Sequence, residues 1–210
     1  MMLKQYKWFF DFAKEERWLS EMSEKGYKLL CVNCSGRYTF QKVDAKKENY
    51  RIDYRIFKNN KDFEDYICIF EDSGWKHIAG NKSSGTQYFM QAKQDASNDI
   101  FSDSASKAGR YKRLSAMWLS LVTAFIPLLV VIVMTNQYKL SAFTNPKELY
   151  LTPGLWEMSG IQFWRAFLFE TPFAIGRGFM WLIFLIIIVF YMAAYIKTRR
   201  QYRRSLRGLI

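Results

Sequence analysis

Three cysteines and one histidine are the residues best suited to metal or redox chemistry. In the stretch CVNC, Cys31 and Cys34 stand three positions apart, and Cys68 and His77 would complete a set of four ligands. Three cysteines and one histidine form a known type of zinc site. Only one Cys-x-x-Cys pair is present, however, and a single pair is weak evidence for metal binding. We therefore expect no metal and no cofactor, with zinc or redox use of Cys31 and Cys34 as the alternative.

Residues for other kinds of catalysis are not evident in the sequence. His77 is the only histidine, and its position on a predicted strand favours a packing role. The sequence has no Ser-His-Asp order and no glycine-rich phosphate loop. Arg51, Arg55 and Lys58 are suited to phosphate, but the alternation in RIDYRIF directs such cations toward water. The expectation is a protein that is not an enzyme.

Two charge-free stretches divide the chain. No charged side chain occurs from Leu114 to Tyr138 or from Gly178 to Ile196. These stretches contain the apolar segments LSAMWLSLVTAFIPLLVVIVM, of 21 residues, and FMWLIFLIIIVFYMAAYI, of 18 residues. A helix needs about 20 apolar residues to cross the hydrocarbon core of a bilayer. The segments are predicted to be two transmembrane helices, the alternative being a pair of buried core helices.

The net charge of +12 is concentrated beside these stretches. Residues 1–103 carry 17 basic and 16 acidic side chains, whereas the tail from Lys197 carries 6 basic side chains and no acidic one. Basic residues mark the cytoplasmic ends of membrane helices and suit anionic headgroups. We expect a cell-membrane protein with two spans, both termini in the cytoplasm, and no nucleic-acid partner. The basic residues assigned to the membrane surface are Arg110, Lys112, Arg113, Lys197, Arg199, Arg200, Arg203 and Arg204.

The N-terminal part shows one pattern twice. The first unit is predicted to have a strand at 6–10, a helix from Phe12 to Lys25 that Gly26 ends, and strands at 27–32 and 37–43. The second unit has a strand at 50–57, a helix that ends at Gly74, and strands from Trp75 and Thr86. At an offset of 48 positions EKGYKLL matches DSGWKHI, and GRYTFQ matches GTQYFMQ with one residue inserted. The interpretation is a duplicated strand–helix–strand–strand unit, with chance similarity as the alternative.

One such unit cannot cover its own apolar face, so the two are expected to combine. The predicted fold class is α+β: two strand–helix–strand–strand repeats form a mostly antiparallel, six-stranded sheet with two helices on one face, followed by two transmembrane helices. The sequence thus divides into a cytosolic duplicated α+β domain (1–91), a polar and basic linker (92–113), the first transmembrane helix (114–138), an extracytoplasmic loop with an aromatic amphipathic segment (139–177), the second transmembrane helix (178–196) and a basic cytoplasmic tail (197–210).

Several spaced motifs resemble the bacterial domain-of-unknown-function family 2812. They are KWFFDF, EERWLSEM, GY, YRIDYR and EDSGWKHIAG, and they cover about residues 4–90. In proteins of this family, membrane helices often follow the domain, and neighbouring genes often encode regulators of the PadR type. The resemblance implies a role in sensing or envelope response, and it implies no reaction and no catalytic residues. CVNC and the aromatic outer loop are not part of the family pattern.

The order of elements is also similar to that of gyrase-inhibitor-like effector-binding domains, which hold apolar, often cationic compounds against aromatic rings. This resemblance implies a ligand-binding set on the strands: Trp8, Tyr38, Tyr54, Trp75 and Tyr88, with Asp53 as the nearby acid. Aromatic rings and a carboxylate both attract cations. The alternative is that these rings fill the core between sheet and helices, which is the usual location of aromatic side chains.

The segment between the two apolar stretches is rich in aromatic residues. LWEMSGIQFWRAFLF, at 155–169, has a narrow polar stripe at helical spacing. This pattern predicts an amphipathic helix in the outer membrane–water interface. It is interpreted as an interfacial anchor, or as a docking surface for a membrane partner or an apolar ligand.

Together these features predict a membrane-anchored, non-enzymatic sensing or regulatory protein. Its cytosolic domain would bind a small apolar or cationic ligand, or a partner protein. The alternative is an accessory or immunity-like subunit of another membrane protein, which acts through its transmembrane helices and aromatic outer loop. The expected partners are the lipid bilayer and a protein of the membrane or cytosol.

Overall fold

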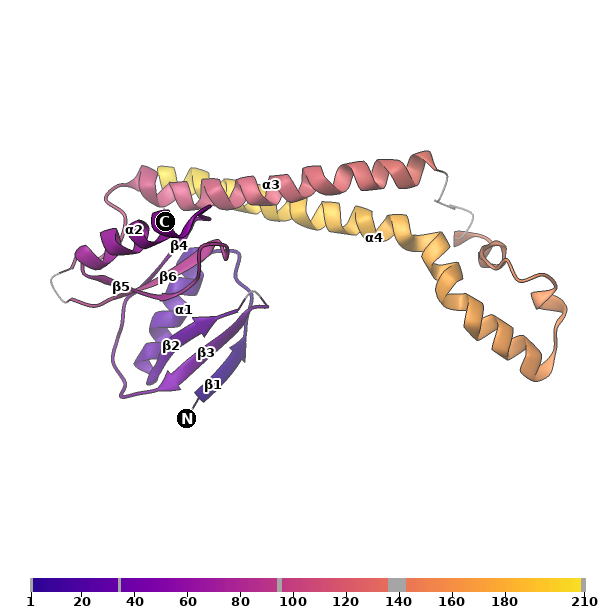
Figure 1. The fold of residues 1–210 in the computed structure, drawn as a ribbon, viewed down its shortest axis with the longest axis horizontal. Helices are drawn as coiled ribbons and strands as arrows, with labels where there is room; N and C mark the ends of the chain where they lie inside the picture. Colours follow the sequence, from indigo (N-terminus) through magenta and orange to yellow (C-terminus); the bar gives the residue numbers. More distant parts are fainter. Residues whose placement is uncertain (1, 34, 94–95, 136–142, 209–210) are drawn as a thin grey trace. The chain divides into compact units, whose positions relative to one another are not determined.

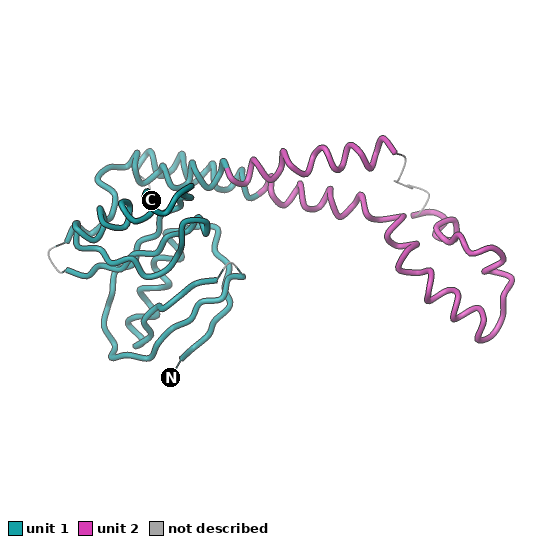
Figure 2. The backbone as a smooth tube through the Cα atoms, in the orientation of Figure 1, with its two compact units in different colours: residues 1–116, 194–210 teal, residues 117–193 magenta. Residues whose placement is uncertain are grey.

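The computed structural model describes residues 2–33, 35–93, 96–135 and 143–208. The chain forms two compact units, which Figure 2 distinguishes by colour. The first unit contains residues 1–116 and 194–210, and the second contains residues 117–193. The first unit is the α+β domain together with one end of each long helix. The second unit holds the C-terminal part of the first long helix, the N-terminal part of the second and the described residues between them.

The first half of the α+β domain contains β1 (Met2–Tyr6), α1 (Phe12–Glu24), β2 (Tyr27–Val32) and β3 (Arg37–Lys42). Helix α1 begins after Asp11, whose carboxylate accepts the backbone N–H of Ala13 at 3.1 Å and so caps the helix. The helix ends before Gly26, which has a left-handed φ of 79°. A glycine is favoured there because a side chain is strained at that backbone angle.

The second half has the same order of elements: β4 (Tyr50–Tyr54), α2 (Asn60–Asp72), β5 (Trp75–Ala79) and β6 (Thr86–Gln91). Asn59 caps α2 by accepting the N–H of Asp62 at 3.3 Å, and Gly74 ends it at a φ of 84°. The expected strand–helix–strand–strand order is therefore present in both halves. Figure 1 labels these elements and colours the chain from N-terminus to C-terminus.

Each half forms its own antiparallel sheet, with strand orders β1-β3-β2 and β4-β6-β5. The registers correspond closely: Tyr6 faces Arg37 in the first sheet, and Tyr54 faces Thr86 in the second. Strands β2 and β5 carry an irregularity in their pairing at equivalent positions, between Leu29 and Cys31 in β2 and between His77 and Ala79 in β5. The two halves thus share pairing as well as element order.

The strands form two three-stranded sheets instead of the expected continuous six-stranded sheet. Strands β2 and β5 lie next to each other at the boundary between the halves, but they are not a hydrogen-bonded pair. The irregularity in each strand explains this, because a bulge bends a strand and interrupts its ladder. The first strand also lies at 2–6 and not at the predicted 6–10. The fold class is α+β as expected.

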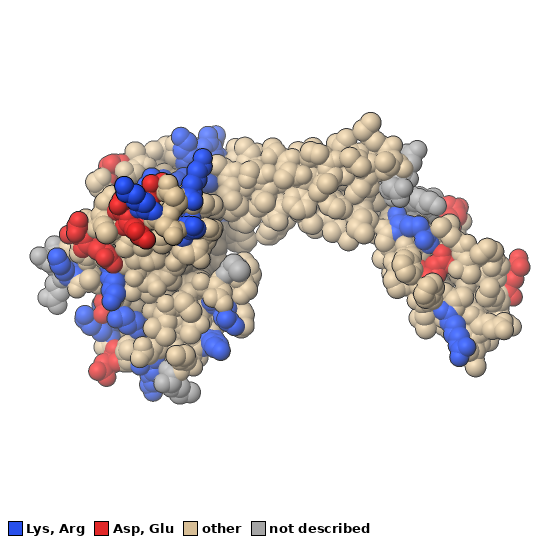
Figure 3. All heavy atoms as spheres, viewed as in Figure 1, with Lys and Arg blue, Asp and Glu red and all other residues tan. Residues whose placement is uncertain are grey.

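Two long helices follow, α3 (Ser104–Met134) and α4 (Gly160–Leu206), each with an internal proline. Both are long and apolar enough to cross a membrane, and only 6% of the apolar window of either is buried. In the second unit Phe125 packs against Phe184 and Tyr191, so α3 and α4 run side by side. The face of these helices that Figure 3 shows carries no charged side chains along their middle. The low burial argues against a pair of core helices.

The aromatic segment at 155–169 is divided. Leu155–Glu157 is a short 3-10 helix, and Gly160 begins α4, so the expected amphipathic helix is the first part of α4. A second 3-10 helix, Pro146–Leu149, precedes it. Residues 136–142 of the predicted outer loop lie outside the described residues.

Candidate functional site

The outer edge of β4 is the place where α1 and α3 meet the second sheet. In an antiparallel pair, alternate residues direct their backbone N–H and C=O groups away from the partner strand. Arg55, just beyond β4, donates its N–H to the C=O of Gly85, just before β6, at 2.7 Å, so Arg55 faces the partner strand. By alternation, Tyr50, Ile52 and Tyr54 of β4 face outward. Backbone groups that are buried without a hydrogen-bond partner are costly. Side chains of α1, α3 and β4 itself satisfy this edge.

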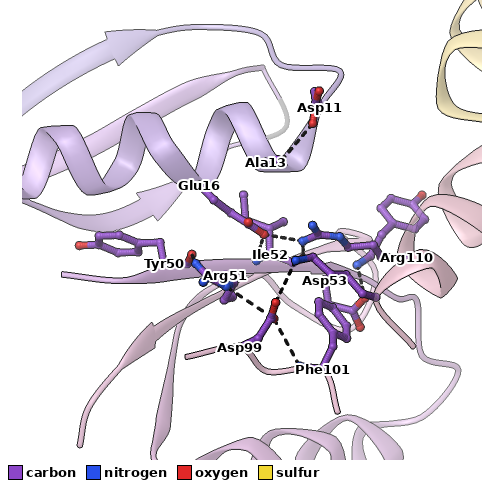
Figure 4. Close-up of polar contacts among 12 residues, drawn as sticks. Asp11, Ala13, Glu16, Tyr50, Arg51, Ile52, Asp53, Asp99, Phe101 and Arg110 are labelled. Carbon is purple, nitrogen blue, oxygen red and sulfur yellow. Dashed lines mark hydrogen bonds and ion pairs between the residues drawn. The ribbon is translucent and has the colours of Figure 1, made fainter. Parts of the chain in front are cut away.

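Ile52 lies at the centre of the edge. Its N–H donates to Oε1 of Glu16 at 3.0 Å, and its C=O accepts from Nη1 of Arg110 at 2.7 Å. Nη1 of Arg110 also donates to Oε1 of Glu16 in a short charge-assisted bond. Figure 4 shows the three residues converging from α1, β4 and α3. The Arg110 side chain is fully buried, and Glu16 is 7% exposed, so the pair is removed from solvent.

Arg113, one turn further along α3, covers the end of the same edge. Its Nη2 lies 2.6 Å from Oδ1 of Asp53, and its Nε donates to the C=O of Tyr54. Asp53 is 3% exposed and also accepts the hydroxyl of Tyr66 at 2.9 Å. Burial and the carboxylate of Asp53 raise the pKa of Tyr66. At the other end, Nη1 of Arg51 donates to the C=O of Tyr50 at 2.9 Å.

Aromatic rings surround the guanidinium of Arg110. Its central carbon lies 5.2 Å from the ring of Phe12, 5.3 Å from that of Phe101 and 5.1 Å from that of Tyr111. Rings at this distance attract a cation through their negative faces, and more strongly when it is desolvated. Nε and Nη2 of Arg110 have no hydrogen-bond partner among the described residues. The rings therefore replace part of the hydration that the cation loses.

The segment before α3 is also attached to the domain. Asp99 pairs with Lys107 at 3.0 Å and with Arg51 at 3.5 Å, and Figure 4 shows it beside Arg51. Ile100 packs against the cluster of Phe57, Tyr66, Trp75 and Phe89. Asp103 caps α3 by accepting the N–H of Ser106 at 2.7 Å.

These contacts correct two expectations. The predicted polar and basic linker at 92–113 is helical from Ser104, where α3 starts, and Ile100 packs against the domain. Arg110 is not available to lipid headgroups, because it is buried against Glu16. Arg113 forms an ion pair with Asp53 and donates a hydrogen bond to the C=O of Tyr54. Charge beside an apolar stretch is typical of a membrane boundary, whereas here two of these cations have carboxylates of the domain as partners.

Glu15, next to Glu16, forms a second buried polar contact. Its Oε1 accepts the hydroxyls of Tyr38 at 2.6 Å and Tyr88 at 2.7 Å, so it joins the two sheets. The side chain is 4% exposed, and no Lys or Arg nitrogen lies within 4.0 Å of its oxygens in the described part of the chain. Burial raises the pKa of Glu15 to about 7, against the opposing effect of the two hydroxyls. Burial also raises the pKa of Glu16, and the charge of Arg110 opposes that shift.

The residues predicted to hold a ligand lie mainly in the core. Tyr38, Tyr54, Trp75, Tyr88 and Asp53 are each at most 8% exposed, and they come from both sheets. Glu15 brings Tyr38 and Tyr88 together, whereas Asp53 binds Tyr66 and Arg113. Only Trp8 of this set is exposed, at 69%. The expected aromatic groove is therefore occupied by the protein's own packing.

The remaining predicted residues are dispersed. Lys112, Lys197, Arg200, Arg203 and Arg204 are exposed, and Arg199 is half-buried. Cys31 and Cys68 are exposed free cysteines, and Cys34 lies outside the described residues. No group of three metal-binding side chains occurs among the residues that the structure describes. His77 packs against Phe63 and Phe89, as expected of a core position.

Sequence reasoning missed Glu15 and Glu16. The adjacent acids in EERW fall near the start of a helix that is otherwise amphipathic, and such acids are usually solvated. The available signal was the pair of arginines about one helical turn apart in RYKR, whose charge needs partners if the helix packs on the domain.

A comparison with protein families identifies one match. The model of the family described as "Protein of unknown function (DUF2812)" matches residues 11–123. The resemblance inferred from the sequence motifs is thereby confirmed. The matched region extends beyond the sheets and includes Arg110 and Arg113 of α3. No curated protein and no solved structure matches the chain.

Replacing Arg110 tests the junction. We expect Arg110→Met to destabilise the domain by about 3–5 kcal/mol, because it leaves the Glu16 carboxylate buried without a counter-charge. Thermal unfolding of the full chain in detergent micelles measures this. Lys112→Met is the matched control, since Lys112 is exposed on the same helix. The double variant Glu16→Gln/Arg110→Met is expected to recover part of the lost stability, because it removes the unpaired carboxylate. Equal stability of Arg110→Met and Lys112→Met would contradict the role assigned to the Arg110–Glu16 pair.

Replacing Glu15 tests its buried carboxyl group. The pKa is about 7 in the folded chain, against 4.5 for a glutamate exposed to water. The stability that Glu15 contributes is therefore complete below pH 4.5 and is lost as the pH rises through about 7. We expect Glu15→Gln to stabilise the protein at pH 8 by up to about 3 kcal/mol and to leave it nearly unchanged at pH 4.5. Unfolding of both proteins measured from pH 4.5 to pH 8 decides this, and parallel curves would show that Glu15 does not titrate differently on folding.

Proposed function

Because the chain belongs to the DUF2812 family of proteins of unknown function, we propose its function from its own contacts: it is a membrane-anchored, non-enzymatic regulatory protein. Its α+β domain binds a partner protein in the cytosol, and α3 connects that domain with the membrane. The observation that carries this proposal is the fully buried Arg110, which joins α3 to Glu16 of α1 and Ile52 of β4.

The junction supports a coupling role. The first turns of α3 are bonded to two elements of the domain, α1 and β4, and such contacts are more than a flexible tether requires. Helix α3 is continuous from Ser104 to Met134, so its packed turns and its apolar part belong to one helix. A shift of α1 or β4 would therefore act on the helix that carries the first apolar stretch.

The burial of the predicted ligand residues favours a protein over a small molecule as the partner. Ligand sites are concave cavities lined by accessible side chains. Five of the six residues assigned to such a site are buried in core contacts. The exposed large apolar residues of the domain, among them Met2, Tyr6 and Trp8, lie on its surface instead. Such exposed side chains are available to a protein partner.

A second candidate rests on the outer segment. A groove of about 450 Å³ is lined by Pro146, Lys147, Tyr150, Trp156, Phe163, Trp164 and Phe167. Tyr150, Phe163 and Phe167 stack on one another at centroid distances of 5.3 and 5.4 Å, which makes the groove pre-formed. This groove supports the alternative of an accessory subunit that binds another membrane protein through its outer segment.

The membrane topology is tested with reporter fusions. Two spans with both termini in the cytoplasm place the segment around Leu151 outside and the tail inside. An alkaline phosphatase fusion after Leu151 is expected to be active, and a fusion after Arg207 inactive. The reverse pair of activities would place the α+β domain outside the cytoplasm and would overturn the proposal.

Site-specific crosslinking in cells separates the two candidates. A photoreactive amino acid at Trp8, on the domain, is expected to give a discrete crosslinked protein, because the regulatory partner binds there. The same amino acid at Trp164 is the comparison, since its side chain is 58% exposed in the outer segment. A discrete product at Trp164 and none at Trp8 would support the accessory-subunit candidate instead.

A further inference from the structure

Strand β1 has an open edge, unlike its counterpart β4. It is hydrogen-bonded to β3 alone, and Figure 1 shows it at the outer side of the domain. Lys7, just after the strand, donates its N–H to Gly36 at 2.9 Å, as Arg55 does to Gly85 in the second half. By the alternation of antiparallel pairing, Met2, Lys4 and Tyr6 direct their N–H and C=O groups outward. No hydrogen bond from another described residue reaches these groups.

The two halves therefore differ at equivalent positions. Met2, Lys4 and Tyr6 stand where the second half has Tyr50, Ile52 and Tyr54, as the matching registers show. In the second half, Arg51, Glu16, Arg110 and Arg113 bond the outward groups. In the first half the same kind of edge is left for solvent or for another chain. An open edge is a template for strand addition.

The side chains of β1 define what can pair there. Met2 is 68% exposed and Tyr6 is 69% exposed, with the exposed Lys4 between them. No carboxylate oxygen of a described residue lies within 4.0 Å of the Lys4 ammonium. Lys7, in contrast, lies over the rings of Phe9 and Trp18. The edge thus presents a cation between two apolar side chains.

A second copy of the chain is disfavoured at this edge in the symmetric antiparallel register. Antiparallel pairing of two β1 strands over all five residues places Lys4 opposite Lys4, and like charges directly opposite are destabilising. An acidic residue at that position is attracted instead. Apolar residues two positions to either side of it then face Met2 and Tyr6, because side chains on one face alternate.

We propose that β1 is a docking edge for an extended segment of a partner protein, which adds as a fourth strand to the sheet β1-β3-β2 and places an acidic residue opposite Lys4 between two apolar residues. Backbone hydrogen bonds to Met2, Lys4 and Tyr6 hold the segment, and the three side chains select its sequence. This proposal rests on the partner-binding role proposed above and names the surface and the chemistry of the partner.

Labelled heptapeptides with the sequences TITETIT and TITKTIT serve as probes. They differ only in the central charge, and each has isoleucine two positions on either side. Binding to the full chain in lipid nanodiscs is measured by fluorescence anisotropy. We expect the glutamate peptide to bind at least threefold more tightly. Amide exchange at Lys4 and Tyr6 is expected to slow when it binds.

Two sets of variants test the charge and the backbone separately. Lys4→Glu is expected to invert the preference between the peptides, whereas Lys42→Glu, an exposed position on the neighbouring strand β3, leaves it unchanged. Lys4→Ala and Lys4→Pro both remove the charge, but only proline removes the outward N–H, which an edge strand tolerates. Lys4→Pro is therefore expected to weaken binding at least tenfold relative to the wild type, and Lys4→Ala about threefold.

Equal binding of the two peptides, or undiminished binding to Lys4→Pro in a chain whose thermal midpoint is unchanged, would overturn the proposal. Dimerisation of the chain that Lys4→Pro abolishes would also overturn it, because the occupant would then be a second copy. The peptide assay uses purified protein and does not depend on membrane topology. A failed fusion experiment with successful peptide binding would reject the proposed function and not the docking edge.

Discussion

The burial of Arg110 is the constraint on which the rest of the first unit depends. A guanidinium that is fully removed from water must find fixed partners, and it finds them in Glu16, the C=O of Ile52 and three aromatic rings. These partners come from α1, β4, the segment before α3 and α3 itself. Their positions are therefore determined together. The requirement explains why the stretch after the last strand is folded onto the domain, although its composition is polar and small.

The same contacts make the two halves of the domain different. Both halves have the same element order and nearly the same register, so each would leave one edge strand with open backbone groups. Among the described residues, only the outer edge of β4 receives side-chain partners, because α3 follows the second half and brings Arg110 and Arg113 to it. Two similar units therefore differ at equivalent edges because of one addition at the end of the second. One edge belongs to the connection with the long helices, and the other is open.

Local sequence patterns predicted most elements of the domain. The prediction failed where contacts between distant parts of the chain determine the structure. Strands β2 and β6 and the ends of α1 and α2 follow from alternation, caps and the glycines at 26 and 74. The strand expected at 6–10 was wrong because aromatic content suggested it, whereas pairing with β3 selects Met2–Tyr6. The roles of Glu16 and Arg110, 94 positions apart, could not be read from either segment alone. Composition had left the ligand and core interpretations open, and the burial of Tyr38 and Trp75 favours the core interpretation.

An ion pair at this junction has consequences that an apolar contact would not have. Apolar packing of the same volume is often as stable as a buried pair, so stability alone does not explain the choice. Arg110 and Glu16, however, bond to the N–H and C=O of a single residue, Ile52, and so fix α3 to one position along β4. A turn of rotation or a shift along the strand would leave a charge and two backbone groups unpaired. The junction therefore favours one register of the first turns of α3 on β4.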